Sequence, residues 1–187
     1  MRNNIGLQKN MIEPIQTKRL LLRQITEVDA EAMFELNEDP EVVRFTGNQR
    51  YRDVQEVLDF IRSYDQYEKY NLGRLTMIES STGEYVGWCG LKYLEEIDEI
   101  DIGYRLKKKY WGKGYATESS IAVLDYGFLH LGLKRIVGRA VRDNVKSTHI
   151  LKKLGMKFEK EFQEHGYICE QYVLTGPDWK EIRKSFS

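Results

Sequence analysis

Two spacings of hydrophobic residues divide the chain into helices and strands. Apolar side chains recur every three or four positions in residues 53–70, which predicts an amphipathic helix. Further helices are predicted at residues 29–37, from Ala116 to about Leu131, and at 144–154, with a last helical turn near Pro177. Gly132 and Gly155 follow two of these helices, at positions where a glycine commonly ends a helix.

Other segments have the patterns of strands. Residues 85–94 are apolar on both faces, which favours a central place in a sheet. In residues 99–106, apolar side chains alternate with polar positions that include Glu99 and Asp101. One face of that strand is therefore apolar, and the other carries two carboxylates. The remaining strands are predicted at 19–25, 74–79, 135–141, 156–164 and 167–175.

The order of these elements predicts an α/β fold. Antiparallel hairpins form the first part of a mixed sheet, and one β-turn-α-β crossover adds a parallel pair. A chain of 187 residues without repeats, low-complexity segments or a proline-rich linker fits one domain over residues 1–187. Residues 1–16 are expected to form a loose N-terminal arm.

Charge and hydropathy exclude several kinds of partner. Lys and Arg together number 29, as do Asp and Glu, so a general attraction to nucleic acid or to an anionic membrane is not expected. No apolar stretch approaches the ~20 residues that cross a bilayer. Residues 1–10 lack the apolar segment of a signal peptide, and we therefore expect a cytoplasmic protein.

The cysteines and histidines do not indicate a metal site. Cys89 and Cys169 lie far apart in the sequence and are expected to be free, buried thiols in a reducing compartment. His130, His149 and His165 are scattered, and no cluster has the spacing of zinc ligands. No metal is expected.

The segment after the strand at 99–106 is rich in lysine and glycine. Residues 107–109 are all lysine, Gly112-x-Gly114 follows, and a helix is predicted directly afterwards. Glycine permits a positive φ and leaves no Cβ in the way of a ligand, while the amides of a helix start favour an anion. This pattern predicts a phosphate or pyrophosphate site. The alternative is a turn that is only structural.

Two common nucleotide-binding motifs fit this turn poorly. The Rossmann pattern has a third glycine or alanine where Thr117 stands, and an acidic residue at the end of the next strand, where residues 138–140 read Gly-Arg-Ala. The P-loop has Ser or Thr directly after Gly-Lys, whereas Gly112-Lys113 is followed by Gly114.

A second polar segment opens the next predicted helix. Asn144 and Ser147 follow the strand at 135–141. In a β-turn-α-β-α unit both helix starts lie at the same edge of the sheet. The turn and these two residues are therefore expected to flank one crevice, where open α/β sheets bind ligands. The alternative is that Asn144 only caps its helix.

With these motifs, the chain resembles the GNAT superfamily of N-acetyltransferases, and within it the RimJ/RimL group of ribosomal-protein N-terminal acetyltransferases. The resemblance covers residues 17–175. It implies a twisted, mostly antiparallel sheet with flanking helices. The matching segments are 17–23, 29–36, 39–45, 101–106, 110–118, Asn144 with Ser147, and 153–156.

The resemblance implies acetyl-CoA as the acetyl donor and an amine as the acceptor. The backbone at Tyr104 and Leu106 is expected to pair with the pantetheine arm. Asn144 is expected to bond the same arm, and Ser147 to lie near the sulfur. The resemblance assigns the pyrophosphate and its surroundings to Lys109, Gly112, Lys113, Gly114, Tyr115, Ala116 and Thr117.

Two positions depart from the pattern of the superfamily. Lys109 stands where the turn commonly begins with Gln or Arg, which keeps a positive charge without the bidentate fork of arginine. Leu151 stands where many members carry a tyrosine that protonates the leaving thiolate. Ser147 is therefore the candidate general acid, and Tyr167 and Tyr172 are weaker candidates.

The expected reaction is direct attack of a neutral amine on the thioester in a ternary complex. An α-amine has a pKa of ~8 and a lysine amine a pKa of ~10.4, so an α-amine needs less help to lose its proton. Glu99 or Asp101 is the candidate base, directly or through water, unless both are only paired on the sheet surface. An acyl-enzyme on Cys89 is less favoured, because a thiol in a central strand belongs to the core.

The acceptor is expected to be a protein or peptide N-terminal amine. The alternatives are a small amine, such as an antibiotic, polyamine or amino acid, and a non-catalytic role as an acyl-CoA sensor. Residues 46–53 and 163–169 are the expected acceptor loops. A dimer is compatible with the sequence, which does not indicate an oligomeric state.

Overall fold

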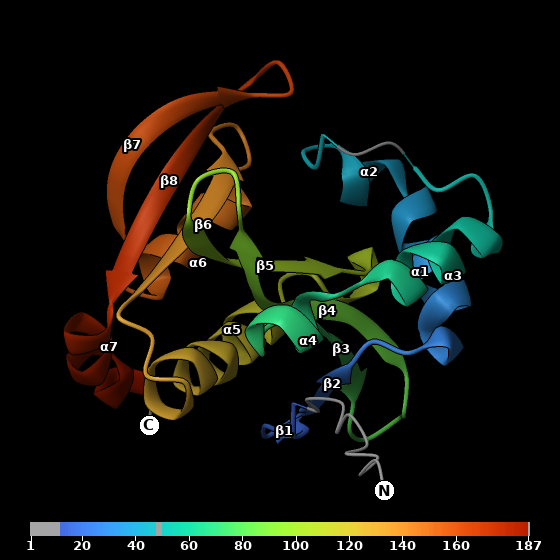
Figure 1. The fold of residues 1–187 in the computed structure, drawn as a ribbon, viewed down its shortest axis with the longest axis horizontal. Helices are drawn as coiled ribbons and strands as arrows, with labels where there is room; N and C mark the ends of the chain where they lie inside the picture. Colours follow the sequence, from blue (N-terminus) through green and yellow to red (C-terminus); the bar gives the residue numbers. More distant parts are fainter. Residues whose placement is uncertain (1–11, 48–49, 187) are drawn as a thin grey trace, which may run out of the picture.

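The computed structural model describes residues 12–47 and 50–186, and its centre is one twisted sheet (Figure 1). The eight strands of the described residues lie in the order β1-β2-β3-β4-β5-β6-β8-β7. Only β5 and β6 pair in parallel. The expected mixed, mostly antiparallel α/β fold is therefore confirmed. The strands are β1 Ile15–Gln16, β2 Leu20–Gln24, β3 Arg74–Glu79, β4 Tyr85–Leu94, β5 Glu99–Leu106, β6 Arg135–Val141, β7 Lys157–Glu164 and β8 Tyr167–Thr175.

Helices flank this sheet. α5 packs against β4 and β5, α6 against β6, and α1 against β4. A π-helical turn at Tyr126–His130 extends α5. Gly132, with φ 66°, then ends it where the sequence predicts a stop. The helices are α1 Ala30–Glu38, α2 Pro40–Val43, α3 Val54–Ser63, α4 Gln66–Tyr70, α5 Tyr115–Asp125, α6 Val145–Lys153 and α7 Gly176–Ile182.

The side chains of β4 contribute to two hydrophobic clusters. Cys89 and Leu91 pack in the same cluster as Leu124 of α5, whereas Trp88 packs with Val57 of α3. Burying a side chain of leucine size stabilises the fold by about 1.5–3 kcal/mol. The central strands are thus held between helices, which fixes the positions of the loops that follow β5 and β6.

The amphipathic segment 53–70 is two helices rather than the single predicted one. Tyr64 lies between α3 and α4 in an extended conformation, with φ −76° and ψ 103°. Its hydroxyl accepts a hydrogen bond from the amide of Arg74 at 2.9 Å, and the Tyr67 hydroxyl donates to the carbonyl of Arg74. The break lets both tyrosines bind the start of β3. Helical spacing alone does not reveal it, because half-buried Tyr64 and buried Tyr67 are three residues apart and so also fit one face of a continuous helix.

The predicted N-terminal arm is shorter than expected. Ile15–Gln16 forms β1 and pairs antiparallel with β2 through Ile15–Leu22 and Gln16–Leu21. Ile12 is 5% exposed and belongs to the core. The rest of the predicted arm, residues 1–11, lies outside the described residues.

Candidate active site

The lysine- and glycine-rich turn joins β5 to α5 and is exposed at its tip. Gly112 and Gly114 have φ values of 72° and 84°, which favour glycine. A Cβ at Gly112 would meet nothing within 4 Å, so the space beside this glycine is open. Gly114 immediately precedes α5, whose first amides have no acceptor within the helix and attract an anion. The geometry suits the pyrophosphate site predicted from the sequence.

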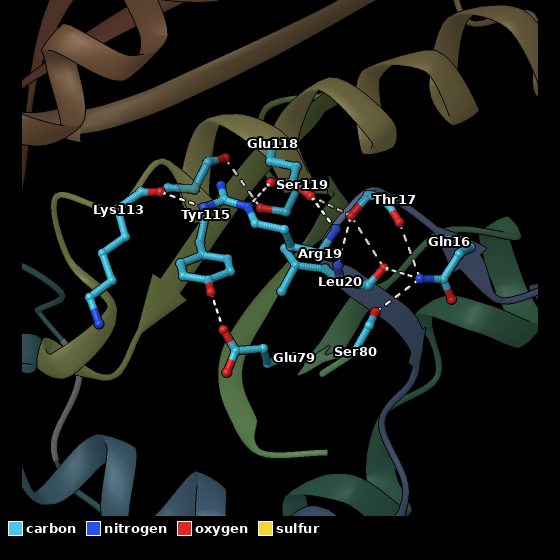
Figure 2. Close-up of polar contacts among 11 residues, drawn as sticks. Gln16, Thr17, Arg19, Leu20, Glu79, Ser80, Lys113, Tyr115, Glu118 and Ser119 are labelled. Atoms are coloured by element: carbon cyan, nitrogen blue, oxygen red, sulfur yellow. Dashed lines mark hydrogen bonds and ion pairs between the residues drawn. The ribbon is translucent and has the colours of Figure 1, made fainter. Parts of the chain in front are cut away.

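Arg19, which directly precedes β2, binds this turn and the start of α5 (Figure 2). Arg19 Nε donates to Glu118 Oε2 at 2.6 Å, and Arg19 Nη1 donates to the carbonyl of Lys113 at 2.9 Å. The same guanidinium lies 4.3 Å from the centre of the Tyr115 ring. We call Arg19 and Glu118 the Arg19–Glu118 clamp. It ties the turn and the start of α5 to the N-terminal side of the sheet.

Further contacts hold the Glu118 carboxylate in place. Its Oε1 accepts from Thr17 Oγ1 at 2.7 Å and from the amide of Arg19 at 2.8 Å. Burial raises the pKa of Glu118, but these hydrogen bonds and the Arg19 charge outweigh it, and the pKa lies below its usual value. Tyr115 in turn donates to Glu79 of β3. Glu118 belongs to a matching motif in the sequence, but its clamping role was not predicted, because its partners lie about a hundred residues away.

The parallel strands β5 and β6 pair over a short distance only. Their register joins Asp101 to Val137 and Ile102 to Gly138. Beyond these residues the described strands are not paired, and Figure 1 shows β5 and β6 diverging. This separation leaves the β6-facing edge of β5 unpaired beside the predicted pantetheine positions Tyr104 and Leu106, which pair with β4 on the other edge.

The tyrosine of β5 reaches the start of α6. The Tyr104 hydroxyl lies 3.0 Å from Ser147 Oγ, and it donates to the carbonyl of Ser147 at 3.3 Å. Burial raises the pKa of the Tyr104 hydroxyl, although the hydrogen bond to Ser147 opposes the shift. Tyr104 therefore keeps its proton at neutral pH. Only the backbone of Tyr104 was predicted to have a role, so its phenol was missed.

The structure brings the two predicted parts of the coenzyme site together. Lys146 at the start of α6 places its Nζ 4.9 Å from the ring of Trp111 in the turn. Trp111 Nε1 donates to the carbonyl of Leu106 at 2.9 Å, which holds the turn against the end of β5. Asn144 also has the capping role that was the alternative: its Oδ1 accepts from the amide of Ser147 at 3.3 Å.

Both candidate base residues are paired with arginines. Glu99 Oε1 lies 2.9 Å from Arg135 Nη2, which also contacts Glu159 at 2.7 Å. Asp101 is buried, and its Oδ2 accepts from Arg74 Nη2 at 2.6 Å. Burial raises the pKa of Asp101, while Arg74 opposes that shift. Of the two, only Asp101 lies in the last paired residues before β5 and β6 separate.

Other residues considered for chemistry are engaged elsewhere. Leu151 is 2% exposed, and its Cδ2 would lie 2.6 Å from a Cβ on Gly138. Tyr172 donates to Glu170, and Tyr167 donates to the carbonyl of Arg44. Cys89 is fully buried in β4, and burial raises the pKa of its thiol, which opposes a nucleophilic role.

The Lys109 ammonium is paired with a carboxylate outside the turn. Its Nζ pairs with Glu84 Oε2 at 2.5 Å, on the segment that precedes β4. Lys113 lies between the two glycines in the sequence and is exposed, and its Nζ, 5.7 Å from the Tyr110 ring, forms no ion pair among the described residues. In this conformation Lys113 is the better placed of the two lysines to meet a phosphate.

The two expected acceptor loops approach each other. Tyr167 donates to the carbonyl of Arg44 at 3.3 Å, and a Cβ on Gly47 would lie 2.4 Å from the His165 ring. The β7–β8 turn therefore lies against the segment that follows α2. Residues 48–49 of the first loop lie outside the described residues.

Residues 12–47 and 50–186 contain neither a metal-like cluster nor a membrane-spanning helix. No group of three or more His, Cys, Asp or Glu side chains there has the arrangement of a metal site. None of the helices found there has the length and hydropathy needed to cross a membrane.

Comparison with known proteins identifies the family that this chain matches. Residues 19–157 match the family model described as an acetyltransferase (GNAT) domain. An uncharacterized N-acetyltransferase of Bacillus licheniformis is 32% identical over 170 residues, which cover 88% of this chain and 96% of that protein. The spermidine N(1)-acetyltransferase of Escherichia coli K12 is 28% identical over 155 residues, 81% of this chain and 80% of that protein.

The fold also matches a solved structure. The crystal structure of a GNAT-family acetyltransferase from Bacillus anthracis superposes with a TM-score of 0.76 at 26% sequence identity. The match covers 88% of this chain and 99% of that chain. Residues 19–157, which match the family model, include the turn and both helix starts described above.

Proposed function

The chain belongs to the GNAT family of acetyltransferases, and from that premise we propose that it transfers acetyl from acetyl-CoA directly to the N-terminal α-amine of a protein or peptide. The family uses acetyl-CoA as the donor. Because named relatives are N-acetyltransferases, the chain is an acyltransferase enzyme rather than a non-catalytic sensor. The RimJ/RimL-like motifs of the sequence support the protein N-terminus as acceptor.

We assign the donor to the crevice between the two helix starts. The turn from Gly112 to Thr117 binds the pyrophosphate through its amides, assisted by Lys113. The edge of β5 that β6 leaves unpaired, near Tyr104 and Leu106, binds the pantetheine arm. The observation that carries this assignment is the separation of β5 from β6 directly beside the turn.

The leaving thiolate receives its proton from the Tyr104–Ser147 pair. As the amine nitrogen bonds to the carbonyl carbon, the C–S bond breaks and its electron pair goes to sulfur. Ser147 Oγ donates a proton to that sulfur, Tyr104 replaces it across their 3.0 Å contact, and the Tyr104 phenolate then regains a proton from solvent water. Two hydroxyls from different elements thus take the role of the tyrosine that Leu151 replaces.

The amine loses its proton toward Asp101, directly or through water. A carboxylate whose pKa is raised is a stronger base than an exposed one, and Asp101 lies at the point where the strands separate. Its pairing with Arg74 limits that basicity. This arrangement suits an α-amine of pKa ~8 better than a lysine amine of pKa ~10.4, because less basicity is needed.

The second candidate acceptor is a small amine. The relative in Escherichia coli that is named a spermidine N(1)-acetyltransferase favours it. The test is release of free CoA from acetyl-CoA, measured with a peptide library and with a panel of polyamines, amino acids and antibiotics. Turnover with peptides supports the N-terminal α-amine, and turnover confined to small amines overturns that part of the proposal. Binding of acetyl-CoA without transfer to any amine would overturn the proposal that the chain catalyses acetyl transfer.

A further inference from the structure

One arginine on the face of β5 opposite Tyr104 has no carboxylate partner. Arg105 alternates with Tyr104 along the strand, so their side chains point to opposite faces of the sheet. The only hydrogen-bond acceptor of its guanidinium among the described residues is Asn37 Oδ1. All Asp and Glu side chains of the sequence lie in the described ranges, and none of them pairs with Arg105. A half-buried guanidinium has five N–H donors, and most of these are unused here.

The surroundings hold Arg105 in place without neutralising it. Asn37 is 5% exposed, and its Nδ2 donates to the carbonyl of Met33 at 2.6 Å, so its Oδ1 is left to face Arg105. The guanidinium carbon lies 5.4 Å from the centre of the Trp88 ring. A fixed and desolvated cation of this kind is costly unless an anion compensates it.

The polar side chains next to Arg105 are further hydrogen-bond donors and do not supply a negative charge. Arg74 lies 5.2 Å from the same Trp88 ring, but both of its terminal nitrogens are occupied by Asp101 and the carbonyl of Gly90. The Tyr85 hydroxyl is buried without a hydrogen-bond partner among the described residues, and it lies within electrostatic range of Arg105. Among the described residues, the Tyr85 hydroxyl and most N–H groups of Arg105 therefore remain unused donors on this face.

We propose that Arg105 binds a carboxylate of the acceptor, and so selects amines that carry a nearby negative charge over polyamines. This inference rests on the proposed acetyl transfer. β5 and β6 are unpaired beyond Ile102, so an amine held on the Arg105 face has a route between the strands to the thioester on the Tyr104 face. The carboxylate belongs either to an acidic side chain near a peptide N-terminus or to the α-carboxyl group of a free amino acid.

The test compares matched acceptors that differ only in that charge. Free CoA is measured with peptides that begin Glu-Ala or Gln-Ala, with free leucine against leucinamide, and with spermidine. We expect kcat/KM for the anionic member of one pair to exceed that of its neutral partner by about tenfold to a hundredfold, the range of a hydrogen-bonded charge. Which pair discriminates identifies the source of the carboxylate.

Variants then assign the discrimination to one residue. Arg105→Gln should abolish it, and Arg105→Lys, which keeps the charge, should retain part of it. Arg62→Gln is the charge-matched control, because Arg62 is 52% exposed and pairs with Glu27 on the outside of α3. A melting temperature and an acetyl-CoA affinity for each variant exclude misfolding.

Two outcomes separate this inference from the proposed function. If CoA is released but anionic and neutral acceptors are used equally, or spermidine is preferred, or Arg105→Gln leaves the preference unchanged, the Arg105 inference is wrong while acetyl transfer stands. If no acceptor gives CoA release, the proposed function fails and the inference fails with it.

Discussion

Replacing Arg19 by Gln tests whether the Arg19–Glu118 clamp shapes the coenzyme turn. The change removes the 2.6 Å contact to Glu118 and the 2.9 Å hydrogen bond to the carbonyl of Lys113. A buried charged hydrogen bond contributes about 1.5–3 kcal/mol. Arg19 is 39% exposed, so solvent screening reduces its pair with Glu118 to ~1 kcal/mol. With ~0.5–1 kcal/mol for the bond to Lys113, the expected loss is about 1.5–2 kcal/mol.

Part of that loss should appear as weaker coenzyme binding. Of the two lost contacts, the hydrogen bond to Lys113 lies beside the predicted pyrophosphate position. If ~1 kcal/mol of the loss falls on CoA binding, the Kd for CoA rises about fivefold. The melting temperature should fall by about 3–8 °C, since ~1 kcal/mol shifts a domain of this size by ~2–4 °C. Isothermal calorimetry with CoA and a thermal melt measure the two effects.

The matched control is Arg62→Gln, which breaks an ion pair whose two side chains are 52% and 55% exposed. It should leave both the melting temperature and the CoA affinity nearly unchanged, because solvent screens an exposed pair. If Arg19→Gln lowers the melting temperature but binds CoA as tightly as the unchanged protein, the clamp only stabilises the fold. The reasoning that connects it to the turn would then be refuted.

Three further changes probe the site. Gly114→Ala and Gly83→Ala both place a side chain at a positive φ, 84° and 72° respectively. Both variants should therefore lose about 1–2 kcal/mol of stability in urea melts. Only Gly114→Ala should weaken CoA binding. Tyr104→Phe should lower kcat by about 10- to 100-fold with little change in the KM for acetyl-CoA; an unchanged kcat excludes the proton relay. The lowered pKa of Glu118 means that its ionised form stabilises the fold above pH ~4.5 and that this contribution is lost as pH falls through the lower folded value. Glu118→Gln should therefore be less stable at pH 7, and its stability should fall less between pH 5 and pH 3.

Local patterns in the sequence predicted most of the fold. Each strand with a clear apolar pattern is present, because such a pattern is satisfied only when one face is buried. The failures lie where distant residues decide. The break at Tyr64 depends on the start of β3, and the strand at Ile15–Gln16 depends on pairing with β2. Neither partner is visible from the local spacing.

The candidate site was predicted in the same uneven way. The turn was found because positive φ requires glycine at Gly112 and Gly114, which a sequence displays directly. The clamp was not found, because its arginine and carboxylate are separated by 99 residues. The roles of Glu99 and Asp101 as base stay predictions, since the structure pairs each with an arginine that the alternation on β5 does not indicate.

The contact between Tyr104 and Ser147 changes how the departure at Leu151 is understood. In the sequence, a leucine at that position removes the expected proton donor and leaves a serine, whose hydroxyl is a weak acid. In the structure, Leu151 is core and packs at Gly138, so a polar group there would need a partner inside an apolar layer. Tyr104 instead supplies a half-buried phenol from β5, 3.0 Å from Ser147 Oγ. A hydroxyl pair of this kind needs a tyrosine on β5 and a serine in the first turn of α6. We therefore expect Ser147 to protonate the thiolate only when Tyr104 is present, and Tyr104 to contribute only when Ser147 is present.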